Sequence, residues 1–353
     1  MVPAARGRGA LSNPAGRYEK QRVVPIEDIE DDEAPAPLRT TVTPEQTRRI
    51  ISTNDSPDIP FDQSINPYRG CEHGCVYCFA RPTHAYLGLS PGLDFETRLF
   101  SKPDAPRLLT QELRQSGYRC RTIALGANTD PYQPIEKRLG ITRALLEVLT
   151  AHRHPVSIVT KSDLVVRDLD LIAGLARDRL ACVMLSVTTL DRGLARRMEP
   201  RAPVPGRRLQ AMRELSAAGI PVGVLASPMI PGLNDSELES ILQAAAEAGA
   251  GSAGYVLLRL PLEIKDLFRE WLETHEPLKA PRIMGLVRDT RGGALYDSTY
   301  GVRMRGVGPH AELLRKRFEV ACRRLSLRHR PLPLETGLFR VPPRAGDQMA
   351  LFR

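Results

Sequence analysis

The sequence of 353 residues predicts an α/β fold with a parallel, barrel-like sheet. Short runs rich in Val, Ile and Leu alternate with amphipathic segments, so that one strand follows the next after about 30 residues. The apolar runs lack a period of two, which indicates strands covered on both faces or strands that line a barrel. The expected strands are 122–127, 156–160, 182–187, 222–227 and 255–258, and the expected helices are 141–151, 165–176, 207–218 and 235–248.

Helix ends and strand ends support this alternation. Gly219 and Gly249 each follow a helical pattern, as expected for the residue that ends a helix. In barrel-like α/β folds the reactive groups gather at the carboxyl ends of the strands. The residues expected there are small or polar, namely 126–130, 160–162, 186–188 and 227–229.

Composition places the chain among globular proteins. Hydrophobic residues make up 42% and charged residues 26%, and the sequence contains no apolar run of eighteen residues that could span a bilayer. The N-terminus has no apolar stretch of the secretory type. The sequence therefore predicts a cytoplasmic protein that does not enter a membrane.

Changes in composition along the chain predict four parts. Residues 1–60 are rich in Pro, Arg and acidic residues and predict a largely irregular extension; 61–275 form the core barrel; 276–335 form a basic segment; 336–353 form a tail. Residues 281–330 hold twelve Lys or Arg against four Asp or Glu, which is most of the net charge of +9. This segment is either a solvated helical face or a contact for nucleic acid.

Three of the six cysteines lie on one short loop in a C-x3-C-x2-C arrangement. Cys71, Cys75 and Cys78 can hold three irons of a four-iron cluster, because thiolates are soft ligands that suit iron–sulfur clusters. The fourth iron would stay open to a small bidentate ligand, such as the amino and carboxylate groups of a methionine moiety. The alternative is a structural zinc site completed by His73 or His84. The isolated Cys120, Cys182 and Cys322 are expected to be ordinary buried thiols.

This loop resembles that of the radical S-adenosylmethionine (SAM) superfamily. The resemblance implies a partial (βα)6 barrel of the TIM type, a [4Fe-4S] cluster, and reductive cleavage of SAM to a 5′-deoxyadenosyl radical. It also implies a low-potential electron donor such as flavodoxin or ferredoxin. The SAM contacts that it implies are Tyr77 and Asn234 near the adenine, Ser186 and Thr188 near the ribose, and Asn128, Thr129 and Asp130 near the methionine end. Asp130 is in addition a candidate catalytic acid or base, since it follows a strand end.

More narrowly, the sequence resembles proteins similar to spore photoproduct lyase. The resemblance rests on Cys-Val-Tyr-Cys, on residues 80–84 (Ala-Arg-Pro-Thr-His) and on residues 129–134 followed by Glu136, and it covers about residues 60 to 280. It implies repair of DNA lesions. Those lyases carry a cysteine hydrogen donor near the second strand, whereas residues 126–136 have none and Cys120 precedes that strand. RNA modification, or a non-enzymatic iron–sulfur or zinc module that binds nucleic acid, remain alternatives.

The C-terminal tail carries a second short motif. Residues 348–352 (Gln-Met-Ala-Leu-Phe) resemble the Q-x-x-L-F peptides with which bacterial proteins bind the DNA sliding clamp. The resemblance implies that Leu351 and Phe352 are buried anchors and that Gln348 hydrogen-bonds at the edge of the clamp pocket. The alternative is that Leu351 and Phe352 pack on the barrel of this chain.

Overall fold

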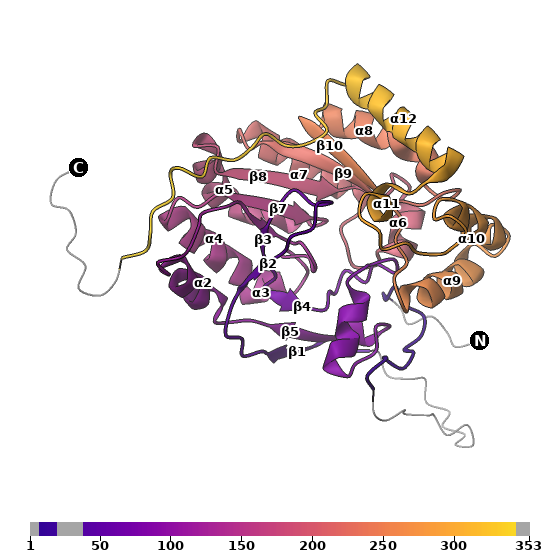
Figure 1. Cartoon of the computed structure of the whole chain (residues 1–353), viewed down its shortest axis with the longest axis horizontal. Helices are drawn as coiled ribbons and strands as arrows, with labels where there is room; N and C mark the ends of the chain where they lie inside the picture. Colours follow the sequence, from indigo (N-terminus) through magenta and orange to yellow (C-terminus); the bar gives the residue numbers. More distant parts are fainter. Residues whose placement is uncertain (1–6, 20–37, 344–353) are drawn as a thin grey trace.

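The computed structural model describes residues 7–19 and 38–343 (Figure 1). In these ranges a sheet with six parallel strands forms the centre of the molecule, and β2 (Ile51–Thr53) joins one edge antiparallel to β3. No pairing between the described strands joins β10 to the other edge, so the sheet is an open, partial barrel. The parallel strands, in spatial order, are β3 (Gln63–Ile65), β6 (Ile123–Leu125), β7 (Val156–Thr160), β8 (Ala181–Ser186), β9 (Val222–Met229) and β10 (Ser252–Leu257).

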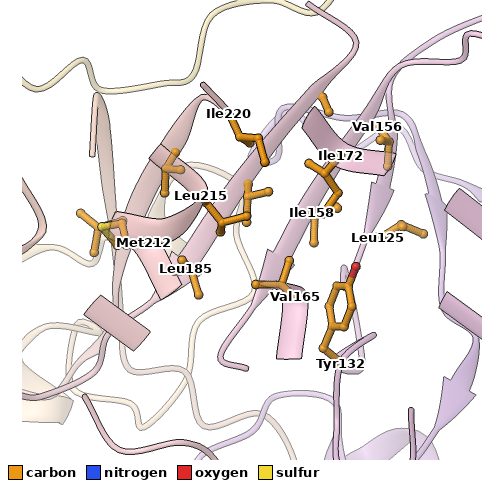
Figure 2. Packing of buried hydrophobic residues seen from close by; sticks show 14 of the residues in the cluster. Leu125, Tyr132, Val156, Ile158, Val165, Ile172, Leu185, Met212, Leu215 and Ile220 are labelled. Carbon is orange, nitrogen blue, oxygen red and sulfur yellow. The ribbon is translucent and has the colours of Figure 1, made fainter. Parts of the chain in front are cut away.

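Helices cover the outer face of this sheet and complete the predicted (βα)6 pattern. They are α2 (Ala105–Leu113), α3 (Glu136–Leu139), α4 (Ile141–Ala151), α5 (Leu169–Arg177), α6 (Arg192–Met198), α7 (Pro205–Ala217) and α8 (Leu238–Glu247). Figure 2 shows Ile158 of β7 near Ile172 of α5, and Leu185 of β8 near Met212 and Leu215 of α7. Each such side chain, when fully buried, contributes about 1.5–3 kcal/mol to folding.

Most of the predicted elements are confirmed within a few residues. Strand β7 and helix α4 have the predicted bounds. Strand β10 begins at Ser252, earlier than predicted, because Ser252 and Gly254 pair with β9 although both look like turn residues. The helical patterns 165–176 and 235–248 each begin with a 3-10 turn, η2 (Asp163–Asp168) and η3 (Asp235–Glu237).

Within residues 1–60, the described parts, 7–19 and 38–60, are more closely packed on the core than an irregular extension would be. They contribute β2 and β1 (Thr41–Pro44), and β1 forms a small sheet with β5 (Arg98–Ser101) and β4 (Tyr68–Arg69). Arg8, Ala10 and Ile50 are buried. Between the cysteines and β5 lie η1 (Arg81–Leu87) and α1 (Asp94–Thr97).

The basic segment is part of the outer layer of the barrel. It contains α10 (Ala280–Asp289), α11 (Val302–Arg305) and α12 (Gly308–Arg324), and α9 (Ile264–His275) precedes it. Helix α12 lies beside α8 in Figure 1, and its Phe318 packs on Tyr255 of β10. Arg315 pairs with Glu312 and Glu319 of its own helix, and Arg317 pairs with Glu239 of α8. Much of the charge on α12 is therefore already neutralised.

The last described residues cross the end of the barrel where the strands begin. The Glu335 amide donates to the Arg179 carbonyl, and the Arg340 amide donates to the His152 carbonyl. Phe339 packs against His154, which precedes β7. The tail motif at residues 348–352 lies outside the described residues. None of the described helices has the length and the apolar surface needed to cross a membrane.

Candidate functional site

The cysteine loop follows β4 and lies at the carboxyl edge of the sheet, where the prediction placed the site. Its backbone is held at several points: the Cys71 amide donates to the Phe95 carbonyl at 2.9 Å and the Val76 amide donates to the Met198 carbonyl at 3.0 Å. Cys71 and Cys75 are buried, and Cys78 is half-buried. The loop thus presents three thiols in a place largely shielded from water.

The environment of the thiols suits a positively charged group. Burial raises the pKa of all three, and at Cys71 the charge of Asp130 and the neighbouring thiols raise it further. Iron ions would relieve this repulsion and hold the thiolate forms. No three His, Cys, Asp or Glu side chains in the described residues already stand in a metal-binding arrangement.

A buried ion pair between Arg81 and Glu96 supports the cysteine loop. Arg81, which is 0% exposed, donates to the carbonyls of Cys75 and Gly74 and pairs with Glu96, also 0% exposed. A single guanidinium therefore holds two carbonyls of the loop and the carboxylate of Glu96 together.

The N-terminal segment completes this support. The amides of Gly9 and Ala10 donate to the two carboxylate oxygens of Glu96 at 3.0 and 2.9 Å. A Cβ at Gly9 would lie 1.7 Å from the Gly74 carbonyl oxygen, so only glycine allows this approach. Arg8 donates to the Glu96 carbonyl at 2.9 Å. These contacts were not predicted, because residues 1–60 show no periodic pattern.

The segment after β6 is tied to the cysteine loop. Gln133 donates to the Gly70 carbonyl at 3.1 Å and accepts from the Glu72 amide at 2.9 Å. Thr129 donates through its hydroxyl to the Tyr68 carbonyl at 2.9 Å, and the Asn128 amide donates to Asn66. Thr129 is 2% exposed and Asn128 is half-buried, so Asn128 is the more accessible of these two predicted SAM contacts.

Asp130 is an ionised hydrogen-bond acceptor in this structure. It accepts from the Thr160 hydroxyl at 2.6 Å and the Lys161 amide at 2.8 Å, and its Oδ2 lies 3.3 Å from His73 Nδ1. Burial opposes ionisation, but the charge and hydrogen bonding of His73 and the other two donors outweigh it and lower the pKa of Asp130 to about 2. Such a carboxylate is a weak base. Its geometry favours positioning His73 on the cysteine loop, and its predicted catalytic role stays a prediction.

Two further predicted contacts, Tyr77 and Thr188, meet in one buried network. Their hydroxyl oxygens are 3.1 Å apart, and both donate to the carboxylate of Glu199. Glu199 also pairs with Arg208, whose Nη1 donates to the Ser186 carbonyl at 3.0 Å. The network joins the cysteine loop to the carboxyl end of β8. Glu199 and Arg208 were not predicted, because no local motif marks a pair that forms across a turn.

Asn234 is engaged with the backbone. Its amide nitrogen donates to the carbonyls of Thr188 and Pro228 at 2.6 and 2.9 Å, and its oxygen accepts from the Ile230 amide. It is 0% exposed. Asn234 therefore ties the ends of β8 and β9 together, and its predicted contact with adenine stays a prediction. Ser186 ends β8, and its side chain is buried at 5% exposure.

Each histidine of the zinc alternative has one ring nitrogen engaged by another group, whereas the second ring nitrogen, His73 Nε2 or His84 Nδ1, is buried without a hydrogen-bond partner in the described residues. His73 faces Asp130, and His84 packs edge-on against Phe95 with Nε2 2.9 Å from the Arg98 carbonyl. Lys161 is a positively charged neighbour of the cysteine loop. Its ammonium lies 5.8 Å from the centre of the Tyr77 ring. Burial raises the pKa of Cys75 and of Cys78, and the charge of Lys161 opposes this rise.

Comparison with known proteins agrees with this arrangement. The model of the Radical SAM superfamily matches residues 65–245. An uncharacterised protein of Mycobacterium tuberculosis is 38% identical over 291 residues, which cover 81% of this chain and 82% of the relative. An uncharacterised protein of Methanocaldococcus jannaschii is 31% identical over 173 residues, or 49% and 62% of the two chains.

The solved structures agree on the fold. Spore photoproduct lyase complexed with dinucleoside spore photoproduct superposes with a TM-score of 0.55 at 16% identity, over 80% of this chain and 78% of that chain. A variant of the same lyase gives a TM-score of 0.54 at 17% identity, with the same coverage.

An open parallel barrel with three loop thiols at its carboxyl edge defines a cofactor-dependent α/β enzyme. Together with the match over half of its length, this shows that the chain belongs to the radical SAM superfamily. Its cofactors are accordingly a [4Fe-4S] cluster and SAM, as the resemblance of the cysteine loop predicted.

Proposed function

We propose that the chain is a radical SAM enzyme that acts on nucleic acid and repairs a DNA lesion. The observation that carries the proposal is the cysteine loop at the carboxyl edge of a fold shared, over 80% of the chain, with a lyase that binds a dinucleoside photoproduct. The excess of Lys and Arg over Asp and Glu in residues 281–330 also supports a polyanionic substrate. Modification of RNA is the second candidate on the same grounds.

The residues assigned to the cofactors follow from the geometry. Cys71, Cys75 and Cys78 would hold the cluster, because in the described residues they are the only cysteines that share a loop. When bound, SAM would supply a 5′-deoxyadenosyl radical that abstracts a hydrogen atom from the substrate. Lys161 lies close enough to the loop to bind an anionic group, such as the carboxylate of SAM.

The other site residues hold this arrangement in place. Thr188 and Glu199 fix the Tyr77 ring, which follows the second cysteine, and Asp130 orients His73 within the loop. Burial of these groups excludes water from the loop, as a reactive intermediate requires. Asp130 would act chiefly by orienting His73 rather than by transferring a proton.

The reaction differs from that of a lyase with a cysteine donor near its second strand. Cys120 precedes β6 and Cys182 lies at the start of β8, so both are at the end of the barrel opposite the cysteine loop. Cys322 is buried in α12. A different hydrogen donor would be needed, or a reaction that needs none.

Electrons would come from a low-potential donor such as flavodoxin or ferredoxin. A cytoplasmic location belongs to the same proposal, since the free thiols and the cluster require a reducing compartment.

Anaerobic reconstitution tests the proposal. The protein, reduced in the presence of SAM and a panel of damaged DNAs, should bind one four-iron cluster, form 5′-deoxyadenosine and convert one lesion. Cys75→Ala should abolish cluster binding and 5′-deoxyadenosine, whereas Cys120→Ala, at the far end of the barrel, should keep both. Stoichiometric zinc without acid-labile sulfide would refute the assignment of the cysteines, and turnover on RNA alone would favour the second candidate.

A further inference from the structure

An exposed aromatic ring with an arginine on its face lies beside the cysteine loop. Phe79 directly follows Cys78, and 43% of its surface is exposed. The Cζ atom of Arg259 lies 5.0 Å from the centre of the Phe79 ring. Arg259 is two residues beyond the end of β10, so the pair bridges the first and last strands of the barrel at its carboxyl edge.

The charge of Arg259 is not compensated by the protein. Its guanidinium makes no ion pair with any carboxylate of the described residues, and its Nη1 contacts only the Met304 sulfur, at 3.5 Å, while its Nε is buried without a partner. Arg143, Arg167 and Arg303, in contrast, each pair with a carboxylate. Arg259 therefore still has donors for a ligand.

A second cation lies close behind it. Arg291 is 2% exposed and donates to the carbonyls of Val302 and Leu258 at 2.8 Å. The Leu258 carbonyl precedes Arg259 directly in the chain, which places Arg291 beside Arg259. Burial lowers the pKa of Arg291, and the charge of Arg259 lowers it further. Two like charges in a partly desolvated place favour an anion between or before them.

A second exposed ring with an arginine on its face lies on the same 3-10 segment after the cysteines. Tyr86, at the other end of η1, is 67% exposed and stacks on Tyr18 with 5.4 Å between ring centres, and Arg17 lies over both rings. Arg17 pairs with Glu263 on the segment that also carries Arg259. Exposed rings repeated beside arginines suit a polymer with a ring and a phosphate in each unit, rather than a single small anion.

We propose that Phe79 and Arg259 bind one nucleotide of the nucleic-acid substrate beside the cluster, Phe79 by stacking on a base and Arg259 by holding a phosphate. This inference deepens the proposed function and rests on nucleic acid being the substrate. The bound nucleic-acid strand would cross the carboxyl edge of the sheet between the cysteine loop and β10. The reacting nucleotide would then lie next to the one that is held.

Binding of DNA by the reconstituted protein tests the pair directly. The probe is a fluorescein-labelled single-stranded DNA of about twelve nucleotides, and its binding is measured by fluorescence anisotropy at about 50 to 300 mM salt. The slope of log affinity against log salt concentration reports how many counterions are released when phosphates are bound. Phe79→Ala should weaken binding about tenfold, since one stacked base contributes that much, and Phe79→Trp should restore it. Arg259→Gln should weaken binding and reduce the salt slope by about 0.7, and Arg259→Lys should keep the slope.

The matched control is Arg213→Gln. Arg213 is an exposed arginine of α7, outside residues 281–330, and this variant loses the same charge at another surface, so it should bind the probe as the native protein does. Iron content and circular dichroism of all variants identify any that fail to fold, and the restoring substitutions at both positions keep the test informative in that case.

Three results would overturn the inference. Native affinity and slope in both Phe79→Ala and Arg259→Gln would remove the pair from the DNA site. Native DNA binding with weakened SAM binding in Arg259→Gln would assign the anion to the carboxylate of SAM. In either case formation of 5′-deoxyadenosine with repair would leave the proposed function intact, whereas no DNA binding by the native protein would end both.

Discussion

At the scale of single residues, buried charges are the main support of the site. Arg81 with Glu96, and Arg208 with Glu199, are ion pairs in which both side chains are at most 1% exposed. Removing one member of such a pair leaves an uncompensated charge in the interior, which costs far more than the pair itself contributes.

Glu199→Ala is therefore expected to lower the free energy of unfolding by about 3–5 kcal/mol. Tyr77 and Thr188 lose their shared acceptor in the same variant, so the cluster should also be lost more readily. Urea unfolding of the reconstituted protein measures the first effect. Glu312→Ala removes an exposed partner of Arg315 and should change little. Equal stability of the two variants would contradict the role given to Glu199.

His154 makes stability depend on pH. It is 0% exposed, and burial lowers its pKa to about 4, while the unfolded value is about 6.5. Below pH 6.5 the unfolded chain takes up a proton that the folded chain refuses, so stability falls as the pH drops from 6.5 toward 4. Between pH 6.5 and 5 this single group should remove about 2 kcal/mol.

Urea unfolding at about pH 6.5 and about pH 5 measures this difference in the free energy of unfolding. The difference should shrink in His154→Gln and persist in His152→Gln, because His152 is much more exposed to solvent. An unchanged difference in His154→Gln would mean that other groups cause the acid sensitivity.

At the scale of elements, the N-terminal segment acts as a brace for the cysteine loop. The backbone amides of Gly9 and Ala10 donate hydrogen bonds to the carboxylate of Glu96, and that carboxylate forms an ion pair with Arg81. The brace joins parts of the chain that are more than 80 residues apart. Its contribution should appear in the lifetime of the cluster rather than in the formation of the barrel.

Deletion of residues 1–12 should shorten the lifetime of the cluster in air several-fold, as measured by the loss of visible absorbance, because Glu96 loses both amide donors. Deletion of residues 1–6 keeps Arg8, Gly9 and Ala10 and should leave the lifetime unchanged. If both deletions behave alike, the brace has no effect on the cluster.

At the scale of the whole molecule, the candidate site and the last described residues lie at opposite ends of the barrel. The cysteine loop, Lys161 and Arg259 are at the carboxyl edge, whereas the last described residues pass His152 and Arg179 at the opposite end. The last described residues therefore lie away from the site.

The proposed clamp motif can therefore be tested separately from catalysis. A peptide of residues 342–353 should bind a purified bacterial sliding clamp, and Leu351→Ala with Phe352→Ala should abolish binding, because a short peptide draws most of its affinity from its apolar anchors. Cluster content and 5′-deoxyadenosine formation should stay the same in the full-length double variant. Loss of thermal stability in that variant would mean that the tail packs on its own barrel.

The sequence by itself determined what local spacing can encode. Alternating apolar strands and helices gave the parallel barrel, as β7 and α4 show, and the interval between Cys71, Cys75 and Cys78 indicated the cluster. These features are readable because each depends on residues only a few positions apart. The three-residue β3 was too short for such a pattern.

Only the tertiary structure decided how distant residues are combined. Gly9 meets Glu96, Tyr77 meets Glu199, and Phe79 meets Arg259, at separations of 87, 122 and 180 residues. Such contacts have no period and no motif, because they depend on how strand ends and loops come together when the barrel packs. The pairing of buried charges follows the same rule: each charged side chain buried by the fold needs a partner, and the fold, not the neighbouring sequence, supplies it.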